Sequence, residues 1–166
     1  MLFVLGFMLF SSLGSKQDKE NNKENPSGKS EASVAHKPDS VINTSDAYLV
    51  LKKTSCYGRC PEYTFYLYPD LTCKIDAKRF YKVEGVKKGE ISRKQMETIK
   101  SKVEIIDFFN LKDSYDNEFV QDVPPTYVSI SNGGAMKKIK SRYGSPKELI
   151  EFQDVLVQII DKVEWK

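Results

Sequence analysis

Residues 71–78 of this 166-residue chain, LTCKIDAK, alternate between apolar and polar side chains. The apolar members are Leu71, Cys73, Ile75 and Ala77, and polar residues stand between them. Successive side chains of a β-strand point to opposite faces of a sheet, so this period of two predicts a strand with one buried face. We therefore expect the chain to fold around a sheet that has one face in a hydrophobic core.

Other strands are expected where β-branched and aromatic residues gather. They lie at residues 47–53, 62–68, 80–86, 127–130 and 136–143. Pro69-Asp70 marks a turn before the strand at 71–78, and Asn132-Gly133-Gly134 predicts a hairpin because a tight turn requires positive φ. Residues 107–125 are acidic and show no periodic pattern, so they are expected to be irregular.

Two amphipathic helices are expected. The first begins with a capping box at residues 92–95, SRKQ, in which the serine hydroxyl and the glutamine side chain each satisfy a free backbone amide. The second begins with Ser145 as N-cap and Pro146 in the first turn. Their apolar faces are Met96, Ile99, Val103 and Ile106, and Leu149, Phe152, Leu156, Ile159 and Val163. The order ββββ-α-ββ-α predicts an α+β fold, with a single antiparallel sheet of about six strands and two helices packed on one face.

Composition divides the chain into three parts. Residues 46–166 form the α+β domain, and about 120 residues are enough for one core. Residues 16–45 contain only three apolar side chains larger than alanine, namely Val34, Val41 and Ile42. So few apolar groups cannot offset the entropy of ordering, and we expect a disordered polar tether there.

Residues 1–15 have the pattern of an export signal. The apolar run from Leu2 to Leu13 is shorter than the about 20 residues that cross a bilayer, and small residues follow it. No Lys or Arg precedes the run, and Ser15 stands where a bacterial lipoprotein precursor has its lipidated cysteine. We expect an extracytoplasmic protein, whether secreted, periplasmic or envelope-associated, that touches a membrane only through this segment if it is not cleaved.

The expected domain contains no histidine, since the single histidine of the chain is His36 in the polar tether. Ser-His-Asp or Cys-His catalysis and histidine-ligated zinc sites are therefore excluded from the domain. Walker, Rossmann and EF-hand patterns are also missing. The formal net charge of +3 is too small to indicate nucleic acid. We expect no catalytic residue, no cofactor, no metal and no nucleic-acid partner.

Cys56 and Cys60 flank a short segment that contains Gly58. In an oxidising compartment we expect a disulfide, which closes the loop between the first two strands and contributes about 2 kcal/mol. Two alternatives remain open. The sequence C-x-x-x-C-P resembles the copper-binding motif of Sco-type copper chaperones, and Cys73 could complete a three-thiolate copper(I) site. The pair could instead catalyse thiol–disulfide exchange. The alternation around Cys73 favours a small buried core residue.

Two charged segments admit a binding role. The acidic one contains Asp113, Asp116, Asn117, Glu118 and Asp122. The basic one contains Lys138, Lys140 and Arg142. The acidic segment offers hard oxygen ligands for calcium, but without a recognised spacing a solvated loop is favoured. The basic segment predicts either an anion-attracting stripe or the ordinary charged face of a strand, and the second is favoured.

The residues around the second cysteine predict a binding surface. Along the second strand, one face carries Tyr63, Phe65 and Leu67 and the other carries Thr64, Tyr66 and Tyr68. One face should be core, and the other would expose two tyrosines close to the cysteine loop. Tyrosine and arginine are enriched at binding interfaces. The candidate surface comprises Tyr57, Gly58, Arg59, Pro61 and Tyr63.

Four motifs together resemble a family of bacterial domains of unknown function. They are CYGRCPEY at 56–63, FFNLKDSY at 108–115, DVPP at 122–125 and YGSPKEL at 143–149. Members of that family carry a C-[FY]-G-x-C-P-x-Y signature near the domain start and are often predicted to be secreted proteins or lipoproteins. The resemblance implies a domain from Asp46 to Trp165 and supports export, but it implies no mechanism. Leu71 departs from the pattern, because a turn glycine is expected at that position.

We therefore expect a non-catalytic extracytoplasmic binding or interaction module for a protein or glycan ligand of the cell envelope. The alternative is a copper-binding or thiol–disulfide redox protein that uses Cys56 and Cys60. A hydrolase built on carboxylates such as Asp113 and Asp122 has no spacing in its favour.

Overall fold

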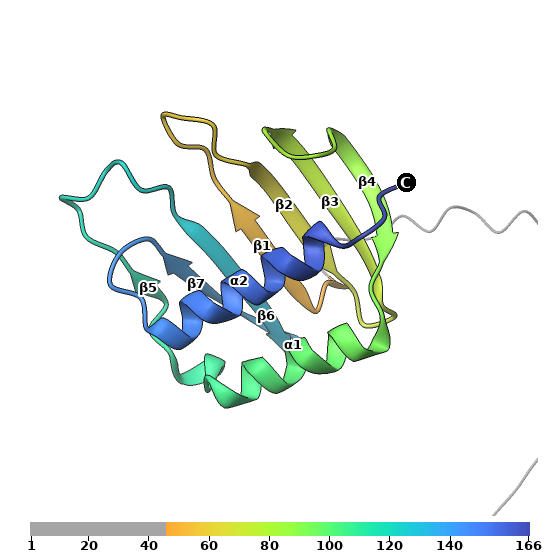
Figure 1. Ribbon diagram of the computed structural model, residues 1–166. Coiled ribbons are helices and arrows are strands. Elements are labelled where there is room, and N and C mark those ends of the chain that lie inside the picture. The colour runs from red at the N-terminus through yellow and green to blue at the C-terminus, as the bar shows by residue number, and fades with distance from the viewer. Residues whose placement is uncertain (1–45) are drawn as a thin grey trace, which may run out of the picture. The chain divides into compact units, whose positions relative to one another are not determined.

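The computed structural model describes residues 46–166 (Figure 1). The expected export signal at 1–15 and the polar tether at 16–45 lie outside the described residues. Within the described part, no helix is long and apolar enough to span a membrane. The α+β class is confirmed, since one sheet of seven strands is accompanied by two α-helices.

The sheet has the strand order β4-β3-β2-β1-β6-β7-β5. Its strands are β1 (Leu49–Lys53), β2 (Glu62–Leu67), β3 (Thr72–Arg79), β4 (Gly85–Glu90), β5 (Ser114–Tyr115), β6 (Thr126–Asn132) and β7 (Ala135–Ser141). Every neighbouring pair is antiparallel except β5 with β7, which is parallel. β1 lies between β2 and β6, so the cysteine loop that joins β1 to β2 leaves from the middle of the sheet.

One face of the sheet forms the core. Leu51 of β1 stands opposite Phe65 of β2 and Val128 of β6, and all three side chains are buried. The alternation that predicted a half-buried strand is confirmed in β3, where Cys73 and Ile75 are buried on the same face. The apolar face of the sheet is therefore continuous across neighbouring strands.

Both α-helices cover that face (Figure 1). α1 (Arg93–Ile105) begins with the predicted capping box, because the Gln95 amide donates to Ser92 Oγ and the Ser92 amide donates to Gln95 Oε1. α2 (Lys147–Asp161) lies beside α1. Their buried residues are Met96, Ile99 and Val103, and Leu149, Phe152, Leu156, Ile159 and Ile160. The predicted apolar faces are confirmed except at their last positions, since Ile106 is the half-buried C-cap of α1 and Val163 is buried but follows the end of α2; Ile160 is buried in addition.

The fourth strand does not lie where its composition predicted it. A strand was expected at 80–86, whereas β4 begins at Gly85. β3 continues as far as Arg79, which pairs with Glu62 at the start of β2. The segment from Phe80 therefore forms the turn between β3 and β4, and strand pairing begins only after it.

The segment 107–125 is not irregular throughout. It contains a short 3₁₀ helix, η2 (Phe108–Asn110), whose first residue is fully buried. It also contains β5, which pairs in parallel with β7. The sheet therefore has seven strands where about six were expected, and it is mixed rather than antiparallel throughout because of the parallel pair β5–β7.

Ser145 is not the N-cap of α2. The N-cap is Pro146, which makes no side-chain capping bond. Ser145 Oγ instead lies 2.7 Å from Ser141 Oγ, so the serine hydroxyl joins the end of β7 to the start of the helix.

A short segment pairs with the outer side of each of the strands β4 and β7. At the β4 edge, Lys88 and Lys166 exchange two backbone N–H···O bonds of 3.1 and 2.9 Å. Gly89 permits the close approach of this C-terminal segment, because a Cβ there would lie 2.5 Å from Val163 Cγ1 and 3.2 Å from the Glu164 carbonyl oxygen. At the other edge, β5 pairs with β7. Unpaired backbone groups at a strand edge promote aggregation. Each of these segments hydrogen-bonds some of the backbone groups that β4 or β7 would otherwise leave unpaired.

Leu71 occupies the turn position at which a glycine was expected. Its φ is +74°, a conformation that costs a non-glycine residue about 1–3 kcal/mol. The turn is closed by the Leu71 amide, which donates to the Tyr68 carbonyl oxygen at 3.1 Å, and Asp70 Oδ1 accepts from the Thr72 amide at 3.0 Å. The leucine side chain packs against the core, which offsets the strain that glycine would avoid.

Candidate functional site

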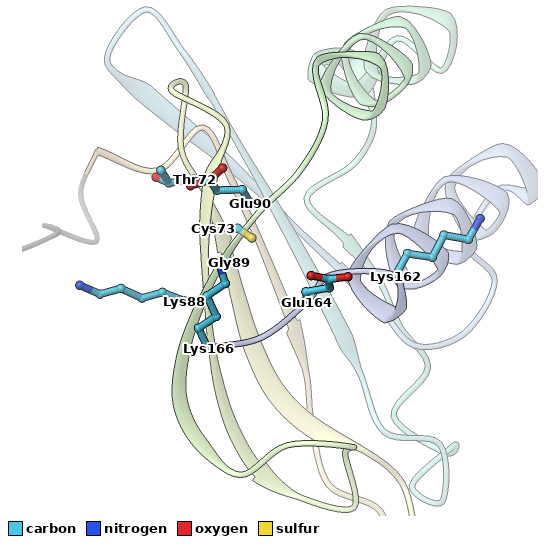
Figure 2. A pocket seen from close by; sticks show the side chains of 8 residues that line it. All are labelled: Thr72, Cys73, Lys88, Gly89, Glu90, Lys162, Glu164 and Lys166. Atoms are coloured by element: carbon cyan, nitrogen blue, oxygen red, sulfur yellow. The ribbon is translucent and has the colours of Figure 1, made fainter.

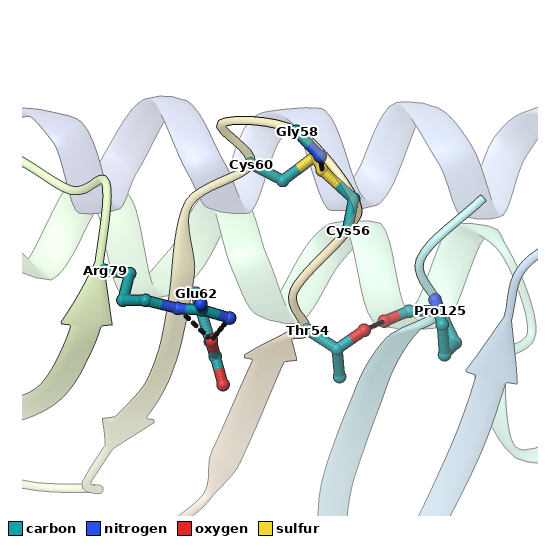
Figure 3. Close-up of a disulfide and its surroundings, with 7 residues drawn as sticks. All are labelled: Thr54, Cys56, Gly58, Cys60, Glu62, Arg79 and Pro125. Atoms are coloured by element: carbon teal, nitrogen blue, oxygen red, sulfur yellow. Dashed lines mark hydrogen bonds and ion pairs between the residues drawn. A yellow bond between two sulfur atoms is a disulfide. The ribbon is translucent and has the colours of Figure 1, made fainter. Parts of the chain in front are cut away.

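The loop at residues 54–61 carries the candidate site and is closed by a disulfide (Figure 3). Cys56 and Cys60 have Cα atoms 5.7 Å apart, and the Gly58 amide donates to Cys56 Sγ at 3.3 Å. A Cβ at Gly58 would lie 3.8 Å from that sulfur, an ordinary contact. The predicted disulfide is therefore present, and the turn inside it does not require glycine for space.

Two further interactions hold this cysteine loop at its ends (Figure 3). Thr54 Oγ1 donates to the Pro125 carbonyl oxygen at 2.7 Å. Where β2 begins, the Arg79 guanidinium donates to Glu62 Oε2 from two nitrogens, at 3.1 and 2.9 Å. The loop is thus closed covalently and attached to the segments on both sides of it.

The residues of the predicted surface divide into two groups. Tyr57 is 95% exposed, Gly58 and Arg59 are exposed, and Pro61 is half-buried. Tyr63, by contrast, is only 2% exposed. Its ring belongs to the core, with Phe65 and Leu67, so the accessible part of the surface lies between Tyr57 and Pro61.

The other tyrosines of the second strand do not enlarge this surface. Tyr66 is half-buried, with Lys74 Nζ 4.5 Å from the centre of its ring. Tyr68 is 5% exposed, and its amide donates to the Thr72 carbonyl oxygen in the turn after β2. Both residues lie toward the end of β2 remote from the cysteine loop. The expectation of two exposed tyrosines beside that loop is wrong.

A cleft of about 250 Å³ separates the cysteine loop from residues 121–125. Cys56 and Tyr57 line one side, and the DVPP motif and Arg142 line the other. The segment that faces the cysteine loop, residues 116–125, also exposes Phe119 by 86%. Two motifs far apart in the sequence therefore meet at one cleft, and the exposed ring of Tyr57 lines it.

Arg142 organises the facing segment. Its guanidinium donates to Asp116 Oδ2 at 2.8 Å and to the Val120 carbonyl oxygen at 3.0 Å. Lys140 Nζ pairs with the same carboxylate. These hydrogen bonds, from Arg142 first and Lys140 second, hold the pKa of Asp116 well below its usual range.

The acidic and the basic segments are thus partners of each other. Lys137 Nζ lies 2.8 Å from Asp113 Oδ1, and Lys138 Nζ lies 4.7 Å from the centre of the Tyr127 ring. In the described part of the chain, no three His, Cys, Asp or Glu side chains form a group that could hold a metal ion. Two carboxylates of the acidic segment are thus engaged in ion pairs, Asp113 with Lys137 and Asp116 with Lys140 and Arg142.

Cys73 lies far from the disulfide. Its side chain is a buried free thiol. In the sheet, Cys73 stands opposite Leu67 at one end of β2, whereas the cysteine loop joins the other end of β2, where Glu62 stands opposite Arg79. Cys73 and Arg79 are six positions apart along β3, a length of about 20 Å. Burial, and secondarily the charge of Glu90, raises the pKa of the Cys73 thiol to about 12. The fold therefore does not bring three thiolates to one copper ion.

A larger hollow, of about 470 Å³, lies where β4 meets the C-terminal segment (Figure 2). Figure 2 shows the Cys73 sulfur on the helix side of the sheet, whereas Lys88 points away from the helices. The residues that line the hollow are Thr72, Cys73, Lys88, Gly89, Glu90, Lys162, Glu164 and Lys166. Because lysines and glutamates mix around it, this hollow offers no convergent set of groups for one ligand.

One known protein family matches almost the whole of the described domain. The family model described as "Domain of unknown function (DUF6438)" matches residues 47–160. The chain belongs to the DUF6438 family. No curated protein and no solved structure matches it. The predicted membership in a domain family of unknown function is confirmed, and the matched range of this DUF6438 domain runs from just before β1 nearly to the end of α2. The cysteine signature and the envelope location stay predictions.

Proposed function

We propose that this DUF6438 domain is a non-catalytic, extracytoplasmic binding module whose cysteine loop contacts a protein or glycan ligand of the cell envelope. Tyr57 carries the proposal, because its side chain is 95% exposed on a loop closed by a disulfide. A large amphipathic ring with few rotatable bonds, presented on a constrained turn, loses little conformational entropy on binding.

The surroundings of Tyr57 support this role. Arg59 adds a cation to the same loop, and the cleft beside Tyr57 can receive a side chain of a partner. Across the cleft, Val123 is 43% exposed. Aromatic and arginine side chains dominate the energetics of interfaces. A disulfide persists in oxidising compartments, which supports the extracytoplasmic part of the proposal.

Photo-crosslinking tests the proposal directly. A benzoylphenylalanine is placed at position 57 of the full chain, or at position 105 as the matched control, because Ile105 is also exposed, by 72%, but lies on α1. In the native envelope fraction we expect a discrete adduct from position 57 only, and we expect Tyr57→Ser to reduce capture of that partner at least tenfold. Equal adducts from both positions, or undiminished capture by the Tyr57→Ser variant, would contradict the proposal.

The same pair of cysteines is the basis of a second proposed function, thiol–disulfide exchange through the bridge or copper binding by the reduced pair. Both require that Cys56 and Cys60 become reduced thiols. Thiol counting on natively purified protein separates the two functions, because a structural disulfide leaves one free thiol, Cys73, and a reduced pair leaves three. Reduction of insulin by the wild type, above the rate of the Cys56→Ser, Cys60→Ser variant, would support the second function and contradict the first.

A further inference from the structure

A cavity of about 260 Å³ lies between the sheet and the end of α2. Pro61, the last residue of the cysteine loop, contributes to its lining. Three parts of the chain contribute its polar groups. They are Lys53 and Tyr63 from the strands that flank the loop, Tyr81 and Lys82 from the turn after β3, and Asp161 from α2. Phe80 and Val157 add apolar walls. Small-molecule sites have this composition, with mostly apolar walls and a few convergent polar groups.

The Tyr63 hydroxyl is the unusual group of the cavity. The residue is 2% exposed, and its hydroxyl makes no hydrogen bond with any described residue. The neighbouring Tyr81 hydroxyl, in contrast, donates to Asp161 Oδ1 at 3.0 Å. Burial, and then the proximity of Tyr81 and Asp161, raises the pKa of Tyr63, so the group is a neutral donor. A buried donor without an acceptor is costly in a protein interior.

The charges around the cavity favour an anion. Lys53 makes no ion pair within the described part of the chain. Lys82 Nζ donates to the carbonyl oxygens of Asp161 and Val163, which offsets the negative end of the helix dipole. At the rim, the Arg59 guanidinium carbon lies 5.7 Å from the centre of the Phe80 ring. The cavity lining thus holds two lysines and one carboxylate, that of Asp161, and Arg59 adds a third cation beside Phe80.

The rim itself is strained. Phe80 has a φ of +57° and is 48% exposed. A bulky residue rarely adopts positive φ, and such outliers cluster at ligand sites. The ring is held at the rim under Arg59, outside the core.

We propose that this cavity binds a carboxylate carried on a small apolar group, with the Tyr63 hydroxyl and the Lys53 ammonium as its two donors. The cavity is smaller than the about 300–1,000 Å³ of sites for drug-sized molecules, so its ligand has the size of one amino-acid residue. A free carboxylic acid and the C-terminal residue of a peptide share this chemistry. The inference goes beyond the proposed function, because it depends on neither Tyr57 nor the cleft at residues 121–125.

Calorimetric titration of the full chain tests the ligand class. The probes are acetyl-leucine, its neutral analogue acetyl-leucinamide, and a five-residue peptide ending in leucine with a free carboxylate. We expect acetyl-leucine to bind at least tenfold more tightly than the amide. Tighter binding of the peptide identifies a peptide terminus as the source, and equal binding identifies a free acid. Tighter binding of phenyl phosphate than of acetyl-leucine, or no binding of either carboxylate probe at millimolar concentration, would overturn the proposal.

Two pairs of variants test the donors. Lys53→Met and Tyr63→Phe should each weaken acetyl-leucine binding at least tenfold. Their matched controls are Lys52→Met and Tyr66→Phe, because these neighbours point to the opposite face of the sheet, and both should bind like the wild type. Tyr63→Phe should keep or raise the melting temperature, since the hydroxyl it removes has no partner. A clear fall in its melting temperature, or unchanged binding by either test variant, would contradict the assignment.

Discussion

Replacing both loop cysteines by serine should lower the free energy of unfolding by about 2 kcal/mol. The bridge joins Cys56 and Cys60, which are four positions apart, and the chain-entropy relation for so short a loop gives this value at 25 °C. The loss arises in the unfolded chain, which regains the freedom that the bridge removes. In the folded protein, the Thr54–Pro125 and Glu62–Arg79 interactions still hold both ends of the loop.

Thermal unfolding followed by circular dichroism measures this effect. For a folded part of about 120 residues, an unfolding entropy of about 2.1 cal/mol/K per residue converts the loss to a fall of about 8 °C in the melting temperature. Wild-type protein in a reducing agent provides a matched control, since it should melt at the temperature of the double variant. The double variant should not respond to the reducing agent, because its remaining thiol, Cys73, forms no disulfide.

Two results would refute this reasoning. An unchanged melting temperature would show that the unfolded chain gains no freedom when the bridge is removed. A fall more than twice as large, accompanied by loss of native near-ultraviolet dichroism, would show that the bridge holds the folded core together. Either result would require a different account of why the loop is closed.

Three further perturbations follow from contacts elsewhere. Gly89→Ala should cost about 1–3 kcal/mol, since its Cβ would lie 2.5 Å from Val163 Cγ1, whereas Gly58→Ala meets nothing nearer than 3.8 Å; equal urea midpoints for the two variants would contradict the packing argument. The hydrogen bonds that arginine and lysine give to Asp116 lower its folded pKa from the ordinary 3.8, so their stabilisation is complete above that pH and is lost as the pH falls below it. Asp116→Asn should therefore remove this part of the acid dependence of the unfolding midpoint, and an unaltered acid profile would rule the linkage out. Burial raises the pKa of Cys73 in the folded protein to about 12 from the ordinary 9.0. The free energy of unfolding should therefore decline as the pH rises through this interval. Rapid labelling of the folded protein by a thiol reagent would show that the thiol is not buried.

The periodicity of apolar residues was sufficient to predict which side chains of β3 and α1 are buried. Ile75 in β3 and Ile99 in α1 are both fully buried, as the periods of two and of three-to-four residues predict. The fourth strand was misplaced because a non-local contact, the pairing of Arg79 with Glu62, lengthens β3 and moves the turn. β5 could not be predicted, since two residues become a strand only through their pairing with β7.

The candidate site was predictable only in part. The disulfide was expected from two cysteines in a short glycine-containing segment together with the pattern of an export signal. The burial of Tyr63 was signalled by the side it shares with Phe65 and Leu67. The bond between Thr54 and Pro125 joins residues 71 positions apart, and no local pattern reports such a contact. The cleft and the acidic-to-basic network depend on contacts of the same non-local kind.

The rest of the fold explains why binding is assigned to the loop end of the sheet. α1 and α2 fill one face with apolar side chains, and the C-terminal segment and β5 pair with the outer sides of β4 and β7. On the opposite face, lysine ammonium groups already lie over the rings of Tyr66 and Tyr127. The cysteine loop, in contrast, is held by a disulfide and by hydrogen bonds at its ends, and the exposed ring of Tyr57 has no role in the core. Substitutions there can change binding without unfolding the domain, which core substitutions cannot do.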